Sequence, residues 1–447
     1  MEAQTGHRMR SELLVLVFVA LAALPVMSLA GPQDRTRYEL TRHIVLYRTL
    51  TIEGGFYDRA QYHGKTYSDK APGMSFLAVP AYEIERLAGI ARSPQQWTQK
   101  GDPALWLIRV LTSGVLFLVS VLIVGRLAER FIPGTGAVTA AVYGTATLVA
   151  PLAPTFFEHD SAAALAIAAF ALLLRGNRAL PIALAGVCAG LAVFFEYSTG
   201  LIALALAALC LARYRRNVLW FVAGLVPGGV ALGAYDQATF GSPFHLSYRY
   251  EAGVLGGEQH KGFFGIGLPT LHGLVDTLVG SRGLLIFSPV LAAAAVGLVL
   301  MWRRGHRGEA LVASVFTLAL LASDAGYFLP YGGGSPGPRF LVPALPFLVL
   351  GLPFALSRFP RATLALSAVS VVLMTVDAVT WGTRNDTAWI PDHPQNLITK
   401  NVWVYLGVNR ILGSGFMLLC GLAAVAVGWR VFRARSQRSS PAAGLTA

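Results

Sequence analysis

Residues 104–125 read ALWLIRVLTSGVLFLVSVLIVG, an apolar run with a single charged residue, Arg109. A helix needs about 20 such residues to cross the hydrocarbon core of a bilayer. Runs of similar character recur along the chain at 12–30, 104–125, 134–153, 160–174, 179–195, 197–212, 217–235, 283–301, 309–328, 338–356, 361–380 and 411–430. The sequence therefore predicts an all-α, polytopic membrane protein with about twelve transmembrane helices.

The composition supports this class. Of the 447 residues, 55% are hydrophobic and 13% are charged, whereas about a quarter of the residues in a soluble domain are charged. A net charge of +13 would suggest nucleic-acid binding in a soluble protein, but in a membrane protein basic residues first report topology. We therefore predict no nucleic-acid partner. The three cysteines all fall inside predicted spans without paired spacing, which indicates neither a disulfide framework nor a metal cluster.

The basic residues gather in alternate short connections between the spans. These connections carry Arg8, Arg10, Arg126, Arg130, Arg175, Arg178, Arg213, Arg215, Arg216, Arg303, Arg304, Arg307, Arg358, Arg361, Arg430, Arg433, Arg435 and Arg438. By the positive-inside rule they face the cytoplasm, so we expect a bacterial inner (plasma) membrane protein with both termini cytoplasmic. Residues 1–435 are then one transmembrane domain, and 436–447 form a cytoplasmic tail that we expect to be disordered.

Three longer segments, 31–103, 236–282 and 381–410, fall on the opposite, outer side. The alternation holds only if residues 72–90 do not cross the membrane, and Pro72, Gly73 and Pro80 suit an interfacial or re-entrant helix there. The first apolar run also resembles a cleavable signal peptide, an alternative that places the chain after Ala30 outside as well.

The first outer segment begins GPQDRTRYELTRHIVLYRTLTIEGG, residues 31–55. Leu40, Ile44 and Tyr47 fall on one helical face, which predicts an amphipathic helix on the membrane surface. Asp34 stands near its N-terminus, where capping the helix is one possible role.

The same segment continues as FYDRAQYHGKTYSDKAPG, residues 56–73. Turns at Gly64 and Pro72 are able to aim several polar side chains at one point. Those side chains are Asp58, Lys65, Tyr67, Asp69 and Lys70. A solvated loop with surface salt bridges is the alternative. Cations at the membrane interface beside an apolar helix instead favour a ligand with a phosphate head and a lipid tail.

These motifs resemble a known family. DRTRY just after the first span, followed by DRAQYHGKTYSDKAPGMSFLAVPAY, is similar to the first periplasmic loop of the GT-C glycosyltransferases, in the branch of the protein O-mannosyltransferases and aminoarabinose transferases. RGLLIFSPVL at 282–291 and GGGSPGPRFLVPALPFL at 332–348 also resemble segments of such proteins. The resemblance implies transfer of a sugar from a polyprenyl-phosphate carrier to a hydroxyl on a lipid, glycan or protein at the outer face of the membrane. It further implies inversion, no metal and no cofactor.

The resemblance also assigns candidate catalytic residues. Asp34 matches the aspartate regarded as the general base, although the usual Asp-Glu pair is Asp34-Arg35 here, which keeps Asp58 and Asp69 as alternatives. Lys70, Lys65 and Arg339 are candidates to stabilise the departing lipid phosphate. For Arg339, an ordinary interfacial anchor is the alternative.

A second polar group lies in FFEHD, residues 156–160. We predict that Glu158, His159 and Asp160 form another wall of the site and bind substrate, with a helix cap at Asp160 as the alternative. Glu158 and Asp160 also remain open as the base. The ligand spacing of a zinc site is absent, so no metal site is predicted.

Two other functions remain open. A polymerase, ligase or flippase of lipid-linked oligosaccharides would use similar outer cations on a pyrophosphate carrier. A non-catalytic membrane scaffold would tolerate replacement of Asp34 and Lys70.

Overall fold

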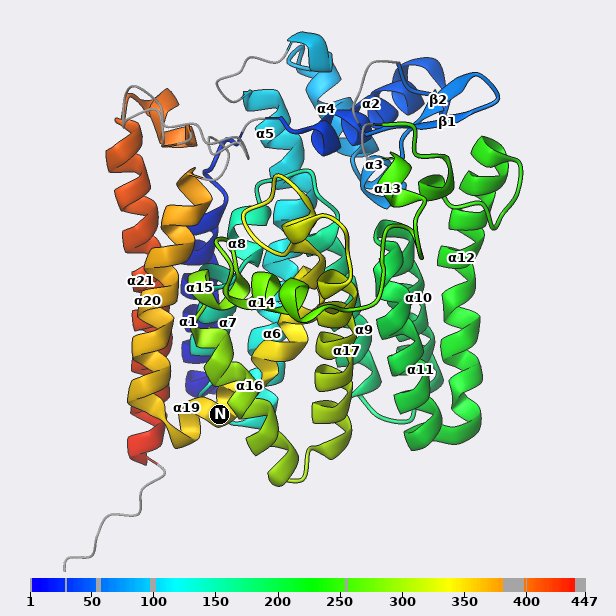
Figure 1. Ribbon diagram of the computed structural model, residues 1–447. Helices are drawn as coiled ribbons and strands as arrows, with labels where there is room; N and C mark the ends of the chain where they lie inside the picture. Colours follow the sequence, from blue (N-terminus) through cyan, green and yellow to red (C-terminus); the bar gives the residue numbers. More distant parts are fainter. Residues whose placement is uncertain are drawn as a thin grey trace, which may run out of the picture.

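The computed structural model describes residues 2–28, 30–53, 58–96, 102–253, 256–380, 398 and 400–438. Most long helices run side by side in a bundle, and a layer of short elements from the segment after the first helix covers one end of it (Figure 1). The protein is almost entirely helical, as predicted, apart from one short hairpin among the described residues.

The bundle is built from helices of unequal length. They are α1 (Glu2–Ala23), α5 (Pro103–Arg109), α6 (Val115–Phe131), α7 (Gly136–Ala146), α8 (Val149–Leu152), α9 (His159–Leu173), α10 (Ala179–Phe195), α11 (Gly200–Tyr214), α12 (Val218–Phe240), α16 (Val290–Arg303), α17 (Arg307–Ala325), α18 (Leu345–Leu348), α19 (Leu352–Arg358), α20 (Pro360–Thr380) and α21 (Arg410–Arg438). A π-helical turn, η2 (Val110–Gly114), joins α5 to α6.

Shorter elements make up the connections. They are α2 (Pro32–Tyr47), β1 (Ala60–Tyr62), β2 (Lys65–Tyr67), α3 (Gly73–Leu77), α4 (Val79–Leu87), α13 (Gly256–Gln259), α14 (Leu271–Val279) and α15 (Leu284–Phe287). The 3-10 turns are η1 (Pro94–Gln96), η3 (Tyr197–Thr199), η4 (Arg215–Asn217), η5 (Ser247–Tyr250), η6 (Pro330–Gly332), η7 (Arg339–Ala344), η8 (Val349–Gly351) and η11 (Val402–Leu406).

Every predicted span coincides with a helix or a broken helix, but their number is not confirmed. Six helical segments are long and apolar enough to cross a membrane, or seven if the pair Leu271–Phe287 and Val290–Arg303, bent by 95°, is one span. Helices α9 and α10 are apolar but shorter than the required length. The structure thus supports a multi-pass membrane protein without settling the count of twelve.

The prediction that residues 72–90 do not cross is confirmed. The segment forms α3, of 5 residues, and α4, of 9 residues, and neither belongs to a candidate span among the described helices. Both lie with α2 in the layer at one end of the bundle (Figure 1).

Helix α2 forms as predicted, and most of its polar side chains are buried within the protein. Arg37 and Glu39 are both 0% exposed, whereas Tyr47, on the predicted apolar face at the end of the helix, is 55% exposed. The polar face turns inward because its charged groups find partners inside the protein, which offset the cost of removing them from water.

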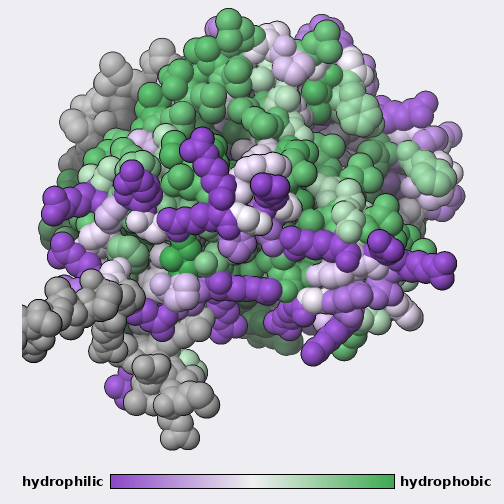
Figure 2. Space-filling model, turned by 90° about the horizontal axis from the view of Figure 1, so that it is seen from below, coloured by the Kyte–Doolittle hydropathy of each residue, from purple (hydrophilic) through white to green (hydrophobic). Residues whose placement is uncertain are grey.

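The opposite end of the bundle carries arginine-rich turns. Arg178 lies between α9 and α10, Arg216 between α11 and α12, and Arg304 between α16 and α17, and all three are exposed. Figure 2 looks onto this end and shows hydrophilic side chains spread across it. One end is therefore basic and the other carries the long connections, as predicted. The larger part of 381–410 and the tail from residue 439 onward lie outside the described residues.

Glycines set the contact between α10 and α12. A Cβ atom on Gly224 would lie 2.1 Å from the carbonyl oxygen of Ala183, and one on Gly186 would lie 2.1 Å from that of Phe221. One turn further along, a Cβ on Gly228 would lie 2.3 Å from the carbonyl carbon of Gly190. Small residues four apart let two helix backbones touch, which is a common way to pack helices within a membrane.

We therefore predict that Gly224→Ala destabilises the protein. The added methyl group has no room, and overpacking of this kind costs roughly 1–3 kcal/mol. The measurement is the thermal unfolding midpoint of purified protein in detergent. Gly229→Ala is the matched control, because Gly229 lies on the same helix with no atom within 4 Å of its Cβ position. Equal midpoints for the two variants would contradict the close contact.

Candidate active site

The β1–β2 hairpin directs the chain inward. Its two-residue turn, His63–Gly64, has φ values of +48° and +73°, as a type I′ turn requires. The register pairs Ala60 with Tyr67, and the Tyr67 ring packs against Phe240 with 5.5 Å between centroids. Tyr67 is thus a buried core residue, whereas Lys65 is exposed on the hairpin, away from the interior.

Beyond β2, Lys70 lies in a cluster of acids. Its Nζ is 2.5 Å from Asp69 Oδ2 and 3.3 Å from Asp58 Oδ2. The segment from η5 to Ala252 is held against this cluster by two hydrogen bonds. Ser247 Oγ donates to the carbonyl oxygen of Asp69 at 2.6 Å. The N–H of Ala252 donates to the carbonyl oxygen of Arg59 at 2.9 Å.

The same segment contains Glu251 and so brings a third acid to the cluster. Burial raises the pKa of Glu251 to about 9, and the neighbouring Asp69 carboxylate adds to the shift. Burial alone would lower the pKa of Lys70, but Asp58 and Asp69 raise it, so the ammonium stays charged. The cluster therefore combines a charged lysine, two aspartates and, near neutral pH, a protonated glutamate.

A second group of charges surrounds Glu158 and His159. Glu158 forms a buried ion pair with Arg37 of α2. Burial alone would raise the pKa of Glu158, but Arg37 and then His159 lower it to about 2. His159 is fully buried, and its Nδ1 lies 3.0 Å from Glu196 Oε2, in the turn between α10 and η3.

Arg339, at the start of η7, lies beside this second group. Its guanidinium carbon is 5.1 Å from the ring centre of Phe157 and 5.2 Å from that of Phe340. The residue is 7% exposed, its Nε has no hydrogen-bond partner, and no acid among the described residues lies within the 4.0 Å of an ion pair. Arg339 is therefore a buried cation held by aromatic faces.

Two tyrosines connect the groups. Burial raises the pKa of Tyr248, and Glu196, Glu158 and Asp69 all act on it, so its hydroxyl lies in the field of both clusters. Burial also raises the pKa of Tyr327, and the positive charges of Lys70 and Arg339 act on its hydroxyl in the opposite direction. The lysine cluster and the arginine–histidine group thus belong to one polar site beneath the hairpin layer.

Comparison with known proteins defines the fold. No family model matches the sequence, and neither does any curated protein. The structure, however, is similar to that of ArnT from Cupriavidus metallidurans in complex with undecaprenyl phosphate, with a TM-score of 0.56 and 16% identity over 96% of this chain and 76% of ArnT. The chain has the GT-C fold.

Two further solved structures share it. The apo state of the same ArnT matches with a TM-score of 0.57 and 17% identity over 96% of this chain and 76% of ArnT. The archaeal oligosaccharyltransferase AglB from Archaeoglobus fulgidus, in complex with an inhibitory peptide and a dolichol-phosphate, matches with a TM-score of 0.50 and 11% identity over 97% of this chain and 56% of AglB.

Within this GT-C fold, Asp34 links α2 to α5 and to the segment before α9. Its Oδ1 accepts from Arg109 NH2 at 2.8 Å and from the N–H of Phe156 at 3.0 Å, and its Oδ2 caps α2 by accepting from the N–H of Gly31 at 2.8 Å. The cap proposed from the sequence is confirmed. With both oxygens occupied, the geometry favours a structural role, while the role of Asp34 as a base stays a prediction.

Asp160 differs from its neighbours. It lies in the first turn of α9, but it caps no backbone N–H, so the expected helix cap is wrong. Both its carboxylate oxygens are buried without a hydrogen-bond partner among the described residues. Glu158 and His159 thus lie in the same polar group, whereas no hydrogen bond or ion pair among the described residues links the Asp160 carboxylate to them.

One group in the site has the composition of a metal centre. The ligand atoms of Glu158, His159 and Glu196 all lie within 4.8 Å of one another. Sequence spacing alone did not reveal the third ligand, because Glu196 comes from a distant turn. Arg37 already neutralises Glu158, so an ion would compete with it. The absence of a metal from the reaction stays a prediction.

The sequence did not single out three side chains that the structure brings to the polar site: Arg37, Glu196 and Tyr327. Glu196 carried one usable signal, since it is an acid in a short outer turn that contains no basic residue. The others lie in segments whose approach to the hairpin depends on tertiary contacts.

We predict that Asp34→Asn lowers the stability of the protein, and that any loss of turnover follows from this loss of stability. It would leave the buried Arg109 charge with a weakened partner, and breaking a buried pair costs about 3–5 kcal/mol. The measurements are the unfolding midpoint and the turnover of the same preparation. A normal midpoint with abolished turnover would instead identify Asp34 as the general base.

A second prediction concerns Glu251 and pH. Its raised pKa means that the folded protein holds a proton that the unfolded chain loses above the ordinary value of 4.5. Stability should therefore fall as pH rises from 4.5 to about 9, and less steeply in Glu251→Gln. Unfolding midpoints across this range test it, with Glu258→Gln, an exposed acid of α13, as control. Parallel curves for wild type and Glu251→Gln would count against the buried, protonated state.

Proposed function

We propose that this protein is a membrane glycosyltransferase that moves a sugar from a polyprenyl-phosphate carrier to an acceptor hydroxyl on a lipid, glycan or protein. The GT-C fold supports this proposal, since ArnT was solved with undecaprenyl phosphate and AglB with a dolichol-phosphate and a peptide. The polar site lies at the end of the bundle away from the arginine-rich turns, which we propose is the periplasmic side of a bacterial inner membrane.

Arg339 is the observation that carries the proposal. A buried guanidinium without an acidic partner is costly unless an anion completes it. Its planar fork suits phosphate oxygens, and the rings of Phe157 and Phe340 hold it in a fixed orientation. A carrier phosphate bound here would therefore meet a cation that needs no rearrangement.

Lys70 is the second cation of the proposed phosphate site. In the structure it is paired with Asp69 and Asp58. The phosphodiester of the donor carries one negative charge, and its oxygens would compete with Asp69 for the Lys70 ammonium group, so donor binding would draw Lys70 away from Asp69. Asp69 would then become available as a base at the moment when the donor is in place.

The proposed reaction is a single displacement. Asp69 takes the proton of the acceptor hydroxyl, the acceptor oxygen forms a bond to the anomeric carbon, and the bond from that carbon to the phosphate oxygen breaks. The electron pair goes to the phosphate, whose growing charge Arg339 and Lys70 stabilise. Inversion and independence from metal are parts of this proposal. Asp58, which contacts the same lysine, is the alternative base.

The test measures release of free polyprenyl phosphate by purified protein in lipid, with polyprenyl-phosphate monosaccharides as donors and a mixed acceptor pool. Arg339→Ala and Asp69→Asn should each lower kcat/KM by roughly 100- to 1,000-fold, as expected when a charge-stabilising or proton-accepting group is removed. Lys261→Ala and Arg361→Ala, which replace exposed cations, serve as controls.

Unfolding midpoints of all variants separate lost chemistry from lost structure. Full turnover by both active-site variants would contradict the assignment of the site. Turnover only with oligosaccharides on a pyrophosphate carrier would favour a polymerase or ligase, and transport without release would favour a flippase. No turnover of any donor would favour a scaffold.

A further inference from the structure

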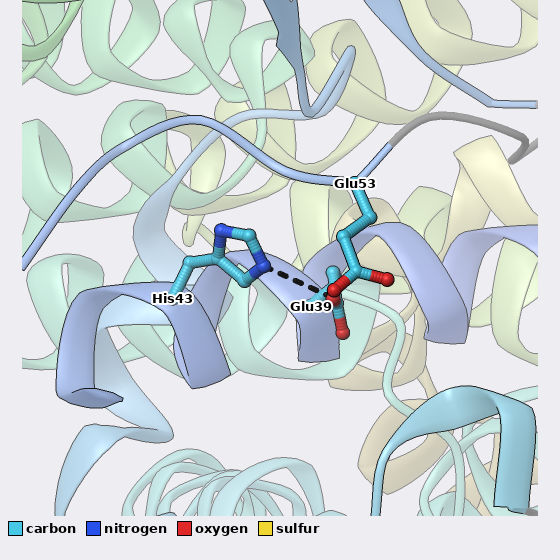
Figure 3. A group of neighbouring side chains, drawn as sticks. All are labelled: Glu39, His43 and Glu53. Atoms are coloured by element: carbon cyan, nitrogen blue, oxygen red, sulfur yellow. Dashed lines mark hydrogen bonds and ion pairs between the residues drawn. The ribbon is translucent and has the colours of Figure 1, made fainter. Parts of the chain in front are cut away.

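A separate group of side chains lies on α2 and the loop after it: Glu39, His43 and Glu53 (Figure 3). Glu39 and His43 are four residues apart on the helix and so share a face. His43 Nε2 lies 3.1 Å from Glu39 Oε1, and the ligand atoms of all three residues lie within 4.8 Å of one another. Figure 3 shows the Glu53 side chain directed from its loop toward the other two.

The side chains of this group are held in place by their surroundings. Glu39 is 0% exposed and His43 8%, and the imidazole is held edge-on by Tyr47 with 4.9 Å between ring centroids. The loop is anchored beside Glu53, since the N–H of Ile52 donates to the carbonyl oxygen of Thr66 at 2.9 Å and Ile52 itself is buried. Both sides of the group are therefore positioned by the fold.

The electrostatics of the group attract a cation. Arg42 NH1 lies 2.8 Å from Glu39 Oε1 and 3.6 Å from Glu53 Oε1, so a guanidinium nitrogen occupies the space between the two carboxylates. Even so, Glu39 Oε2 is buried with no hydrogen-bond partner among the described residues. A buried carboxylate oxygen without a donor is unfavourable, and a metal ion can bind both oxygens of one carboxylate.

We propose that Glu39, His43 and Glu53 form a binding site for a divalent cation of the Zn²⁺ class, in competition with the Arg42 side chain. One imidazole nitrogen and two carboxylates suit zinc, with water as a further ligand. Arg42 is long and its side chain is 15% exposed, so it is able to turn toward solvent when the ion enters. The site requires nothing of the proposed transferase chemistry.

The location gives the ion a structural effect. Glu53 stands five residues before Asp58 in the chain, and Thr66, which anchors the loop, belongs to β2 of the hairpin that leads to Asp69 and Lys70. An ion shared by α2 and this loop would clamp the hairpin layer onto α2. Metal availability outside the cytoplasm would then influence how firmly the acidic cluster is held.

The experiment uses the full-length protein in detergent, stripped of metal with a chelator that is then removed. Zn²⁺ binding is measured by calorimetry at pH 7.5, and X-ray absorption at the zinc edge reports the ligand types. We expect a site with nitrogen and oxygen ligands. Glu53→Gln should weaken binding by roughly 10- to 100-fold, the range expected when a supporting or ligating group is lost. Glu83→Gln, a surface acid of α4 paired with Arg86, is the control.

Arg42→Ala separates a metal site from an ordinary ion-pair network. If Arg42 competes with the ion, its removal tightens Zn²⁺ binding and raises the unfolding midpoint of the zinc-loaded protein above that of the metal-free variant. If the group is only an ion-pair network, the variant is destabilised and zinc does not restore it. That result overturns the proposal.

Glu196→Gln assigns the zinc to one of the two candidate groups. Binding that survives this variant but is weakened in Glu53→Gln supports the proposed site. Binding lost in Glu196→Gln and unchanged in Glu53→Gln would place the ion at Glu158, His159 and Glu196 and overturn the proposal, as would the absence of zinc binding to the wild-type protein.

Discussion

A buried ion pair between Asp34 and Arg109 holds the outer layer on the bundle. The guanidinium of Arg109 contacts Asp34 and also donates to the carbonyl oxygen and the hydroxyl of Ser28, at the end of the segment that leaves α1. Asp34 in turn accepts from the N–H of Phe156. The pair thus connects the exit of α1, the start of α2, α5 and the approach to α9. Charges this deeply buried are tolerated only when their hydrogen-bonding capacity is filled, so these elements have little freedom to move apart.

The rest of the site depends on this orientation of α2. One helical turn after Asp34, Arg37 is placed against Glu158, and the residue next to Glu158, His159, reaches Glu196. The same helix supports the loop and hairpin that deliver Asp69 and Lys70. A single short helix with a buried polar face therefore sets the distance between the two halves of the site. This explains why the polar side chains of α2 are packed inside the protein.

The two halves differ in charge balance. Lys70 is surrounded by acids, one of which is held protonated by burial, and Arg37 is matched by Glu158. Arg339 packs against the rings of Phe157 and Phe340, and no acid among the described residues lies within ion-pair distance of it, although Asp324 interacts with it at longer range. The site is therefore neutralised around the lysine and open to an anion at the arginine. In the proposed function, the carrier phosphate would therefore bind at Arg339 first, and Lys70 would join it when its acidic partners release it.

Three features were predictable from the amino-acid sequence: the class of protein, the division into a basic and a loop-bearing end, and the non-spanning segment 72–90. These depend on apolar length and on where arginines fall, which are local properties. The sequence also drew attention to several polar residues beside apolar runs, which are unusual at a membrane interface, and the structure places them in one polar site: Asp69, Lys70, Glu158, His159 and Arg339. Tertiary structure alone decided that Asp34 is braced by Arg109, that Lys65 stays outside, and that Glu196 and Glu251 complete the two clusters. Those outcomes depend on which distant segments come into contact and on how strongly their charged groups are desolvated. Neither can be read from a local sequence pattern.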